Sequence, residues 1–252
     1  MKINRTSLRT IEIMKLISDN ADGLTLEDIC SALQMPKTSC YDILVTLVQT
    51  GMVDMGREDK IKYYIGLGSY RVGVMYSRRM NSMHIVNREL QELAVRLNRT
   101  VMFGVPFEDE VTSVYKFEPE NPAITAVRVG SRRPMYCTSL GKAMLSAMSM
   151  TELHGYLDHV ELQPKTPWTI VDKDALLEDL RMAKERGYSV DNRELESHML
   201  CVGAPVFDMH GKVVGAVSAS GLYGDDYDYH LIGEAIAAKA AAISQLNGYV
   251  KR

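Results

Sequence analysis

The amino-acid sequence predicts an α+β protein with a winged helix-turn-helix at its N-terminus, a linker helix and a larger C-terminal domain. Two amphipathic helices flank a tight turn within residues 25–51, and two short β-prone runs follow at 53–65. From residue 83 onward, strand patterns alternate with helix patterns. Of the 252 residues, 46% are hydrophobic, so the chain can bury a small core and a medium one.

Apolar spacing predicts a first helix over residues 5–20 and a second that begins after Thr25. Thr25 and Asp28 have the spacing of a capping box, in which each side chain accepts from a backbone N–H that the helix leaves free. The two apolar stripes are Leu8, Ile11, Met14 and Ile17, then Leu26, Ile29, Cys30 and Leu33.

A third helix is expected between Pro36, which suits a first helical turn, and Gly51, which suits a left-handed C-cap. Its apolar stripe leaves small polar groups near its N-terminus, as in a helix that reads the major groove. The pattern alone is equally typical of a helical hairpin with a solvated face. The β-prone runs 53–55 and 61–65 that follow have the order of a wing and favour the DNA-binding interpretation.

Charge predicts few but well-placed contacts to double-stranded DNA. The chain has 29 Lys and Arg against 32 Asp and Glu, and residues 1–66 alone have eight basic and nine acidic residues, which favours a few placed cations over a general electrostatic attraction. We therefore expect weak non-specific binding by a monomer and useful affinity from paired half-sites. The candidate DNA-contacting residues are Arg9, Lys37, Thr38, Ser39, Tyr41, Asp42, Val45, Lys60 and Lys62.

The predicted domains are 1–66 for the winged helix-turn-helix, 67–82 for the linker helix and 83–252 for the remainder. In the remainder, helices are expected at 85–98, 140–148, 151–159, 173–186 and 231–247. Strands are expected at 101–105, 111–117, 124–129, 188–190, 201–207 and 213–220.

Compartment and cofactor signals are sparse. The sequence contains neither a long apolar run nor a signal-peptide core, so a cytoplasmic protein without membrane contact is expected. Its four cysteines lack CxxC spacing, which favours free thiols. No cofactor is predicted.

Two features of the C-terminal part suggest a ligand. Ser218 and Ser220 share one face of a strand, and buried hydroxyls need partners, either a ligand or neighbouring backbone. The segment 138–142 opens a helix, whose free N–H groups and dipole favour an anion. Asp191 and Cys201 bracket a polar loop that matters only if it closes over the same cavity.

Several motifs in fixed order resemble the IclR family of bacterial transcriptional regulators. They are Ser7-Leu8-Arg9, Pro36-Lys37-Thr38-Ser39, Tyr64-Ile65-Gly66-Leu67-Gly68, Thr138-Ser139-Leu140-Gly141-Lys142-Ala143, Arg186-Gly187-Tyr188-Ser189-Val190-Asp191, Cys201-Val202-Gly203-Ala204-Pro205 and the stretch 211–221. The resemblance implies a GAF-like effector-binding domain at 83–252. It also implies a homodimer or homotetramer that binds a palindromic DNA operator and responds to a small organic acid.

The resemblance also implies which residues bind the effector. We expect the effector to be a hydroxy- or keto-acid, sugar-derived acids included, and the protein to repress a catabolic operon. The implied effector-binding residues are Ser139, Leu140, Gly141, Asp191, Met199, Cys201, Ser218 and Ser220.

Two positions depart from the family pattern. Asp42 stands where recognition helices of the family often carry Arg, so Asp42 either accepts from a cytosine amino group or caps locally, and we favour the local role. His198 replaces a common Gly. It is either an exposed loop residue, which we favour, or part of a metal site with Asp191 and Cys201.

Two alternatives to a regulator remain. In an enzyme acting on a small acid, Cys201 would be the nucleophile, His198 the base and Asp191 the group that orients it, or the same residues would bind a metal. We do not expect an enzyme, because His198 lies three residues from Cys201 in a loop and no oxyanion-hole motif is evident. The other alternative is a metabolite-binding module whose winged helix binds protein.

Overall fold

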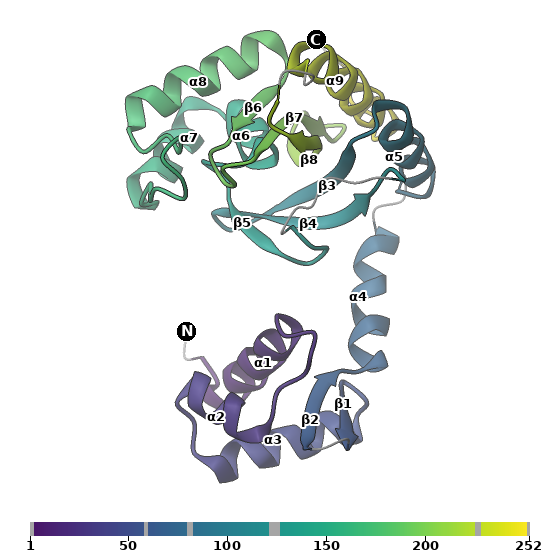
Figure 1. The fold of residues 1–252 in the computed structure, drawn as a ribbon, viewed down its shortest axis with the longest axis vertical. Helices are drawn as coiled ribbons and strands as arrows, with labels where there is room; N and C mark the ends of the chain where they lie inside the picture. The colour runs from purple at the N-terminus through teal and green to yellow at the C-terminus, as the bar shows by residue number, and fades with distance from the viewer. Residues whose placement is uncertain (1–2, 58–59, 80–82, 121–126, 225–227, 251–252) are drawn as a thin grey trace. The chain divides into compact units, whose positions relative to one another are not determined.

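The computed structural model describes residues 3–57, 60–79, 83–120, 127–224 and 228–250 (Figure 1). The chain divides into two compact units, Met1–Met83 and His84–Arg252, which are described separately below. Among the described residues, none of the helices combines the length and apolarity needed to cross a bilayer.

The N-terminal unit has the element order of a winged helix-turn-helix. An antiparallel hairpin follows three helices and leads into a fourth helix, and Val53 pairs with Ile65. The elements are α1 (Arg5–Ser18), α2 (Leu26–Leu33), α3 (Lys37–Gln49), β1 (Val53–Arg57), β2 (Ile61–Ile65) and α4 (Leu67–Arg79).

Local signals in the sequence account for the ends of these helices. The capping box of α2 is present, with Thr25 accepting from the N–H of Asp28 and Asp28 accepting from that of Thr25. Gly51 follows α3 with φ +68°, as a left-handed C-cap residue requires. Pro36 is the N-cap residue of α3 rather than part of its first turn.

The core of the N-terminal unit forms where α1, α2, α3 and the hairpin meet. It includes Ile13, Ile17, Ile29 and Leu44, all at most 2% exposed. The predicted stripe of α1 is wrong in part, because Leu8 and Ile11 are exposed. Ile17 of the predicted stripe is buried, and it shares the buried face with Ile13, four residues before it, which the predicted stripe does not include.

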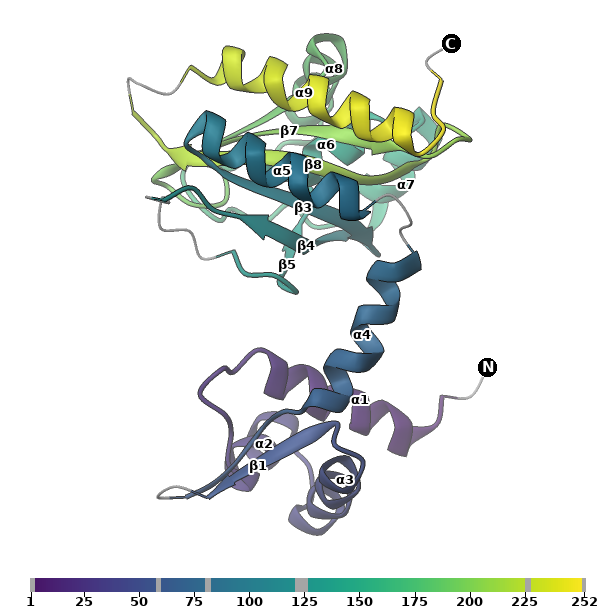
Figure 2. The ribbon, with the colours of Figure 1, turned by 90° about the vertical axis from the view of Figure 1, so that its right-hand side faces the viewer.

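The C-terminal unit is an antiparallel six-stranded sheet with helices on both faces (Figure 2). The strand order is β5-β4-β3-β8-β7-β6. In Figure 2, α5 and α9 lie across one face, and α6, α7 and α8 lie behind the sheet. The elements are α5 (Met83–Leu97), β3 (Thr100–Phe107), β4 (Glu110–Phe117), β5 (Arg132–Pro134), α6 (Ser139–Ser146), α7 (Met150–His159), α8 (Lys173–Arg186), β6 (Ser189–Asn192), β7 (Met199–Phe207), β8 (Val213–Leu222) and α9 (Tyr229–Leu246).

Most predicted elements of this unit are confirmed within a few residues, and one is wrong. A strand at 124–129 was expected; residues 124–126 lie outside the described part, and 127–129 are not in a strand. The edge strand is instead β5, whose Arg133 pairs with Val111. With only three residues and no apolar alternation, β5 carries no strand signal in the sequence.

Candidate functional site

Helix α6 begins directly on the face of the sheet. Its N-cap residue Thr138 accepts from the N–H of Gly141, while Ser189 Oγ donates to the carbonyl of Ser139 at 2.6 Å. A Cβ on Gly203 of β7 would lie 2.5 Å from that carbonyl, so glycine permits this close approach. Among the described residues, no protein acceptor faces the N–H groups of Ser139 and Leu140. Both residues line the same cavity, where the N-terminal end of the helix dipole places partial positive charge.

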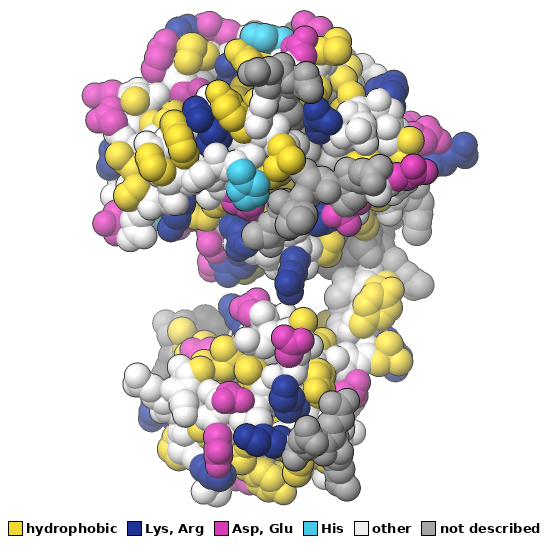
Figure 3. Space-filling model, viewed as in Figure 1, with side chains coloured by type: hydrophobic (Ala, Val, Ile, Leu, Met, Phe, Trp, Pro, Cys, Tyr) yellow, Lys and Arg dark blue, Asp and Glu magenta, His cyan; other side chains and the backbone are white. Residues whose placement is uncertain are grey.

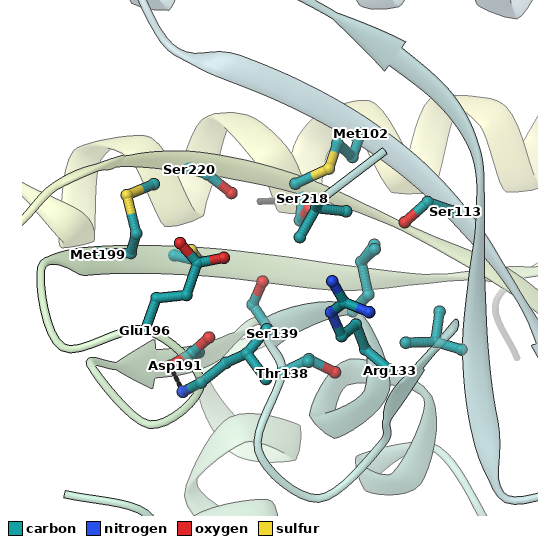
Figure 4. A pocket seen from close by; sticks show the side chains of 15 residues that line it. Met102, Ser113, Arg133, Thr138, Ser139, Asp191, Glu196, Met199, Ser218 and Ser220 are labelled. Atoms are coloured by element: carbon teal, nitrogen blue, oxygen red, sulfur yellow. Dashed lines mark hydrogen bonds between the residues drawn. The ribbon is translucent and has the colours of Figure 1, made fainter. Parts of the chain in front are cut away.

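A narrow cavity opens at this helix start (Figure 4); the atom-free space in and in front of it, open solvent included, is about 470 Å³. The structure brings together residues that lie far apart in the sequence. Of the predicted effector residues, those that line the cavity are Ser139, Leu140, Asp191, Met199, Cys201, Ser218 and Ser220.

Gly141 is the exception. It does not line the cavity, because its N–H is taken by Thr138 and its α-carbon packs where a Cβ would lie 2.2 Å from Met135 Cα. Eight further residues line the cavity without having been predicted to bind the effector: Met102, Val111, Ser113, Val127, Arg133, Thr138, Leu195 and Glu196. Strand alternation could have indicated Val111 and Ser113, but Arg133 and Glu196 lie where the sequence has no periodic pattern.

Asp191, Cys201 and Ser220 form a row across three neighbouring strands. Asp191 of β6 pairs with Cys201 of β7, and Cys201 pairs with Ser220 of β8. Paired residues of a sheet point to the same face, so all three side chains reach the cavity.

The hydroxyls of Ser218 and Ser220 are buried without a hydrogen-bond partner among the described residues. Ser220 lies opposite the Cys201 thiol and interacts with it, which lowers the pKa of the thiol against the larger effect of burial, but a thiol is only a weak hydrogen-bond partner. Of the two alternatives that the sequence leaves open for these hydroxyls, bonding to neighbouring backbone is not observed among the described residues. An unpaired buried hydroxyl costs stability, and a polar ligand would satisfy it.

Burial controls the charges in this cavity. The pKa of Asp191 is raised to about 7 by burial and by the nearby carboxylate of Glu194. Asp191 Oδ1 accepts from the N–H of Glu194 at 2.8 Å, which opposes the shift in its pKa. Near neutral pH Asp191 therefore exists in both forms, and its protonated form can donate a hydrogen bond to a ligand oxygen.

The loop between β6 and β7 is held in place by several contacts. The buried ammonium of Lys142 lies 2.5 Å from Glu194 Oε1 and 2.6 Å from Asp179 Oδ2. The guanidinium of Arg193 lies 4.3 Å from the centre of the Trp168 ring and 4.0 Å from that of Tyr223. These contacts fix the segment that supplies Leu195 and Glu196 to the cavity.

The same geometry argues against the enzyme and metal alternatives. Burial, followed by the carboxylate of Asp191, raises the pKa of the Cys201 thiol well above its ordinary value, so the nucleophilic thiolate is disfavoured. The imidazole of His198 is largely exposed and lies 3.6 Å from Glu196. Within the described part of the chain, no group of three His, Cys, Asp or Glu residues is placed to hold a metal ion.

Helix α3 presents a polar face to solvent. Thr38, Tyr41, Asp42 and Val45 are exposed, with Tyr41 at 51%, and Ser39 is half-buried. The local capping role expected for Asp42 is not observed, because its side chain has no bonding partner among the described residues; Thr46 bonds its carbonyl instead.

The predicted cations of the N-terminal unit differ in their surroundings. Lys37 pairs with Glu27 at 3.3 Å, Lys62 donates to the carbonyl of Asp22, and Lys60 is exposed. Arg9 is half-buried on α1. Basic and acidic side chains are interspersed on the visible face of this unit (Figure 3), as its near-balanced composition predicts.

A winged helix-turn-helix followed by an α+β domain with a polar-lined cavity is the architecture of an effector-responsive, DNA-binding transcriptional regulator. The family model "IclR helix-turn-helix domain" matches residues 8–54, and "Bacterial transcriptional regulator IclR C-terminal" matches residues 74–245. The chain belongs to the IclR family of bacterial transcriptional regulators. This confirms the family resemblance, the fold class and the expectation of a regulator rather than an enzyme.

Individual relatives are similar to this chain over almost its whole length. The HTH-type transcriptional regulator XynR of Escherichia coli K12 is 28% identical over 258 residues, covering 99% of both chains. The crystal structure of the Thermotoga maritima IclR protein has a TM-score of 0.79 and 31% identity, covering 97% of this chain and 99% of that one. An IclR homologue from Microbacterium hydrocarbonoxydans, complexed with 4-hydroxybenzoate, has a TM-score of 0.84 and 18% identity, covering 96% and 98%.

Proposed function

We propose that this protein is a repressor whose operator affinity is lowered when a small organic acid occupies the cavity at the start of α6. The observation that carries the proposal is the pair of buried, unpartnered hydroxyls of Ser218 and Ser220 in the same cavity as the free N–H groups of Ser139 and Leu140. Donors on two walls suit a ligand with a carboxylate at one end and further oxygens at the other.

The DNA-contacting part of the proposal is the exposed face of α3. Thr38, Ser39, Tyr41, Asp42 and Val45 would meet base edges and phosphates of the operator. The cations Arg9, Lys37, Lys60 and Lys62 would contact phosphates. Because operators lie on the chromosome, the protein would act in the cytoplasm.

A homodimer would supply the affinity that one near-neutral unit lacks. Apolar side chains on α1 and α4 are exposed within the N-terminal unit, with Ile11 at 51%, Tyr70 at 67% and Met75 at 54%. Exposed apolar side chains of this kind are typical of a subunit interface. Two copies would then read half-sites separated by about one helical turn or a multiple of it.

A repressor that an acid releases would suit a catabolic operon, since an accumulating acid would induce the enzymes that consume it. A thermal-shift screen of lactate, glycerate, gluconate, pyruvate and 4-hydroxybenzoate would identify a stabilising acid. The operator probe is a duplex selected by the protein from a random pool. We expect the acid to weaken operator binding by roughly 5- to 150-fold, the usual range of allosteric coupling. An operator affinity that no acid changes would refute the proposal.

A further inference from the structure

The cavity contains two side chains of opposite charge that do not pair with each other. Arg133, from the edge strand β5, and Glu196, from the loop before β7, both line it. In Figure 4 they point into the cavity from either side of Ser139. Among the described residues, no carboxylate lies within 4.0 Å of the Arg133 guanidinium, whose Nη1 donates to the backbone carbonyl of Arg132.

Both groups are partly withdrawn from water. Arg133 is half-buried, and the side chain of Glu196 is 17% exposed. Glu196 lies 3.6 Å from the imidazole of His198. Much of the remaining wall is apolar, with Met102, Val111 and Val127 among its residues. A charged group in such surroundings gains most from a ligand group of complementary charge or hydrogen-bonding capacity.

We propose that Arg133 and Glu196 select the effector by its two ends, so that the ligand is an acid bearing a hydrogen-bond donor and not a keto-acid without one. This inference rests on the proposed function. The guanidinium of Arg133 and the N–H groups of Ser139 and Leu140 receive the carboxylate. The carboxylate of Glu196, which can only accept while ionised, receives a hydroxyl or an ammonium group.

A hydroxyl and an ammonium group both donate a hydrogen bond to a carboxylate, so either one would satisfy Glu196. A keto oxygen only accepts, and it would leave Glu196 facing another acceptor in a partly desolvated site. The resulting repulsion is a specificity element against keto-acids.

The test uses two sets of matched compounds with the full-length protein in titration calorimetry. The three-carbon set is lactate, alanine, pyruvate and lactamide. The ring set is 4-hydroxybenzoate, 4-(aminomethyl)benzoate, benzoate and 4-hydroxybenzamide. In at least one set, the compound with both groups should bind about tenfold or more tightly than the compound that lacks the donor or the negative charge. Preference for the hydroxyl or the ammonium member identifies the donor.

Two variants assign the preferences to residues. Arg133→Gln should reduce the preference for acid over amide, because only the N–H groups of Ser139 and Leu140 would still receive the carboxylate, and it should keep the preference for a donor. Glu196→Leu should abolish the preference for a donor and keep the preference for acid over amide. Arg132→Gln is the matched control. Arg132 pairs with Glu108 and Glu110 and is not among the residues that line the cavity, so this variant should bind every compound as the wild type does. Thermal melts of each variant check that it folds.

The inference is overturned if, in every set that binds, the compound without the donor binds as tightly as its donor-bearing partner. It is also overturned if Arg133→Gln leaves the preference for acid over amide unchanged, or if neither set binds at millimolar concentration. These outcomes are separable from a failure of the proposed function. If pyruvate binds best and weakens operator binding, the proposed function stands and this inference fails. If no acid alters operator affinity, the proposed function itself fails.

Discussion

Lys142 and Glu194 form a buried ion pair, with Nζ 2.5 Å from Oε1 and side chains 1% and 4% exposed. Lys142 lies on α6, the helix that begins at the cavity, and Glu194 lies in the loop that covers it. Lys142 also donates to the carbonyl of Val190 at 2.7 Å, one residue before Asp191. The pair therefore ties together two walls of the cavity.

Replacing Lys142 by Met should destabilise the protein strongly. The carboxylates of Glu194 and Asp179 would remain in a buried place without their cation, which typically costs about 3–5 kcal/mol. Urea denaturation measures the free energy of unfolding. Lys184→Met, on the exposed side of α8, is the control and should stay within about 0.5 kcal/mol of the wild type. A loss below about 1 kcal/mol for Lys142→Met would contradict the role of the pair.

Replacing Ser218 or Ser220 by Ala should weaken ligand binding without weakening the fold. Each hydroxyl is buried and unpaired, so its removal relieves a desolvation cost of about 1 kcal/mol or more. Thermal melts should show an unchanged or higher midpoint, and the acid found by the screen should bind less tightly. Ser146→Ala is the matched control, because the Ser146 hydroxyl is hydrogen-bonded to Ala143; it should lose stability and keep its ligand affinity.

Asp191 should make stability decrease between about pH 4 and pH 7. Its pKa is about 7 in the folded chain and 3.8 in a model peptide, so the folded state binds more protons in that window. Stability present at low pH is then lost as pH rises toward 7, and it is constant above. Asp191→Asn should remove this component. Denaturation of both proteins across this range measures it, and parallel curves would show that Asp191 does not titrate as its burial requires.

Replacing Tyr41 by Ala should reduce operator affinity and leave stability unchanged. Tyr41 is 51% exposed on α3, so its removal costs little packing. Loss of a base-edge or phosphate contact is worth about 1–3 kcal/mol. Mobility-shift titrations on the selected duplex measure the change. Gln49→Ala, near the other end of α3, is the matched control. Equal operator affinity of Tyr41→Ala and Gln49→Ala would contradict a contact between Tyr41 and the operator.

Glycines 203 and 155 should respond oppositely to Ala. At Gly203 the new Cβ would meet the carbonyl of Ser139 at 2.5 Å, so the start of α6 must shift, at a cost of about 1–3 kcal/mol. At Gly155, inside α7, nothing lies within 4 Å, and Ala should stabilise by about 0.5–1 kcal/mol. Denaturation curves of both variants measure this. A tolerated Gly203→Ala would mean that α6 is not tightly seated on the sheet.

Periodic patterns made much of this fold predictable. The stripes of α2 and α3 are regular, and the alternation in β8 places Ser218 and Ser220 on one face before any coordinates are known. The row of Asp191, Cys201 and Ser220 was expected only through the family resemblance, since strand register is a long-range property that local sequence does not encode.

The residues that the sequence did not place correctly were missed for physical reasons. Arg133 lies in a three-residue edge strand, and Glu196 lies in a loop, so neither has a periodicity that would assign it to the cavity. Leu8 and Ile11 match the helical spacing, yet they lie on the exposed side of α1. A helix with apolar residues on two faces does not reveal which face meets the core.

The stacking of Trp168 on Arg193 has an optical consequence. The chain contains one tryptophan, and its ring lies 4.3 Å from a guanidinium on the loop that borders the cavity. We expect the emission of this indole to change whenever that loop moves. The fluorescence of Trp168 should therefore report effector binding in the native protein without an added label.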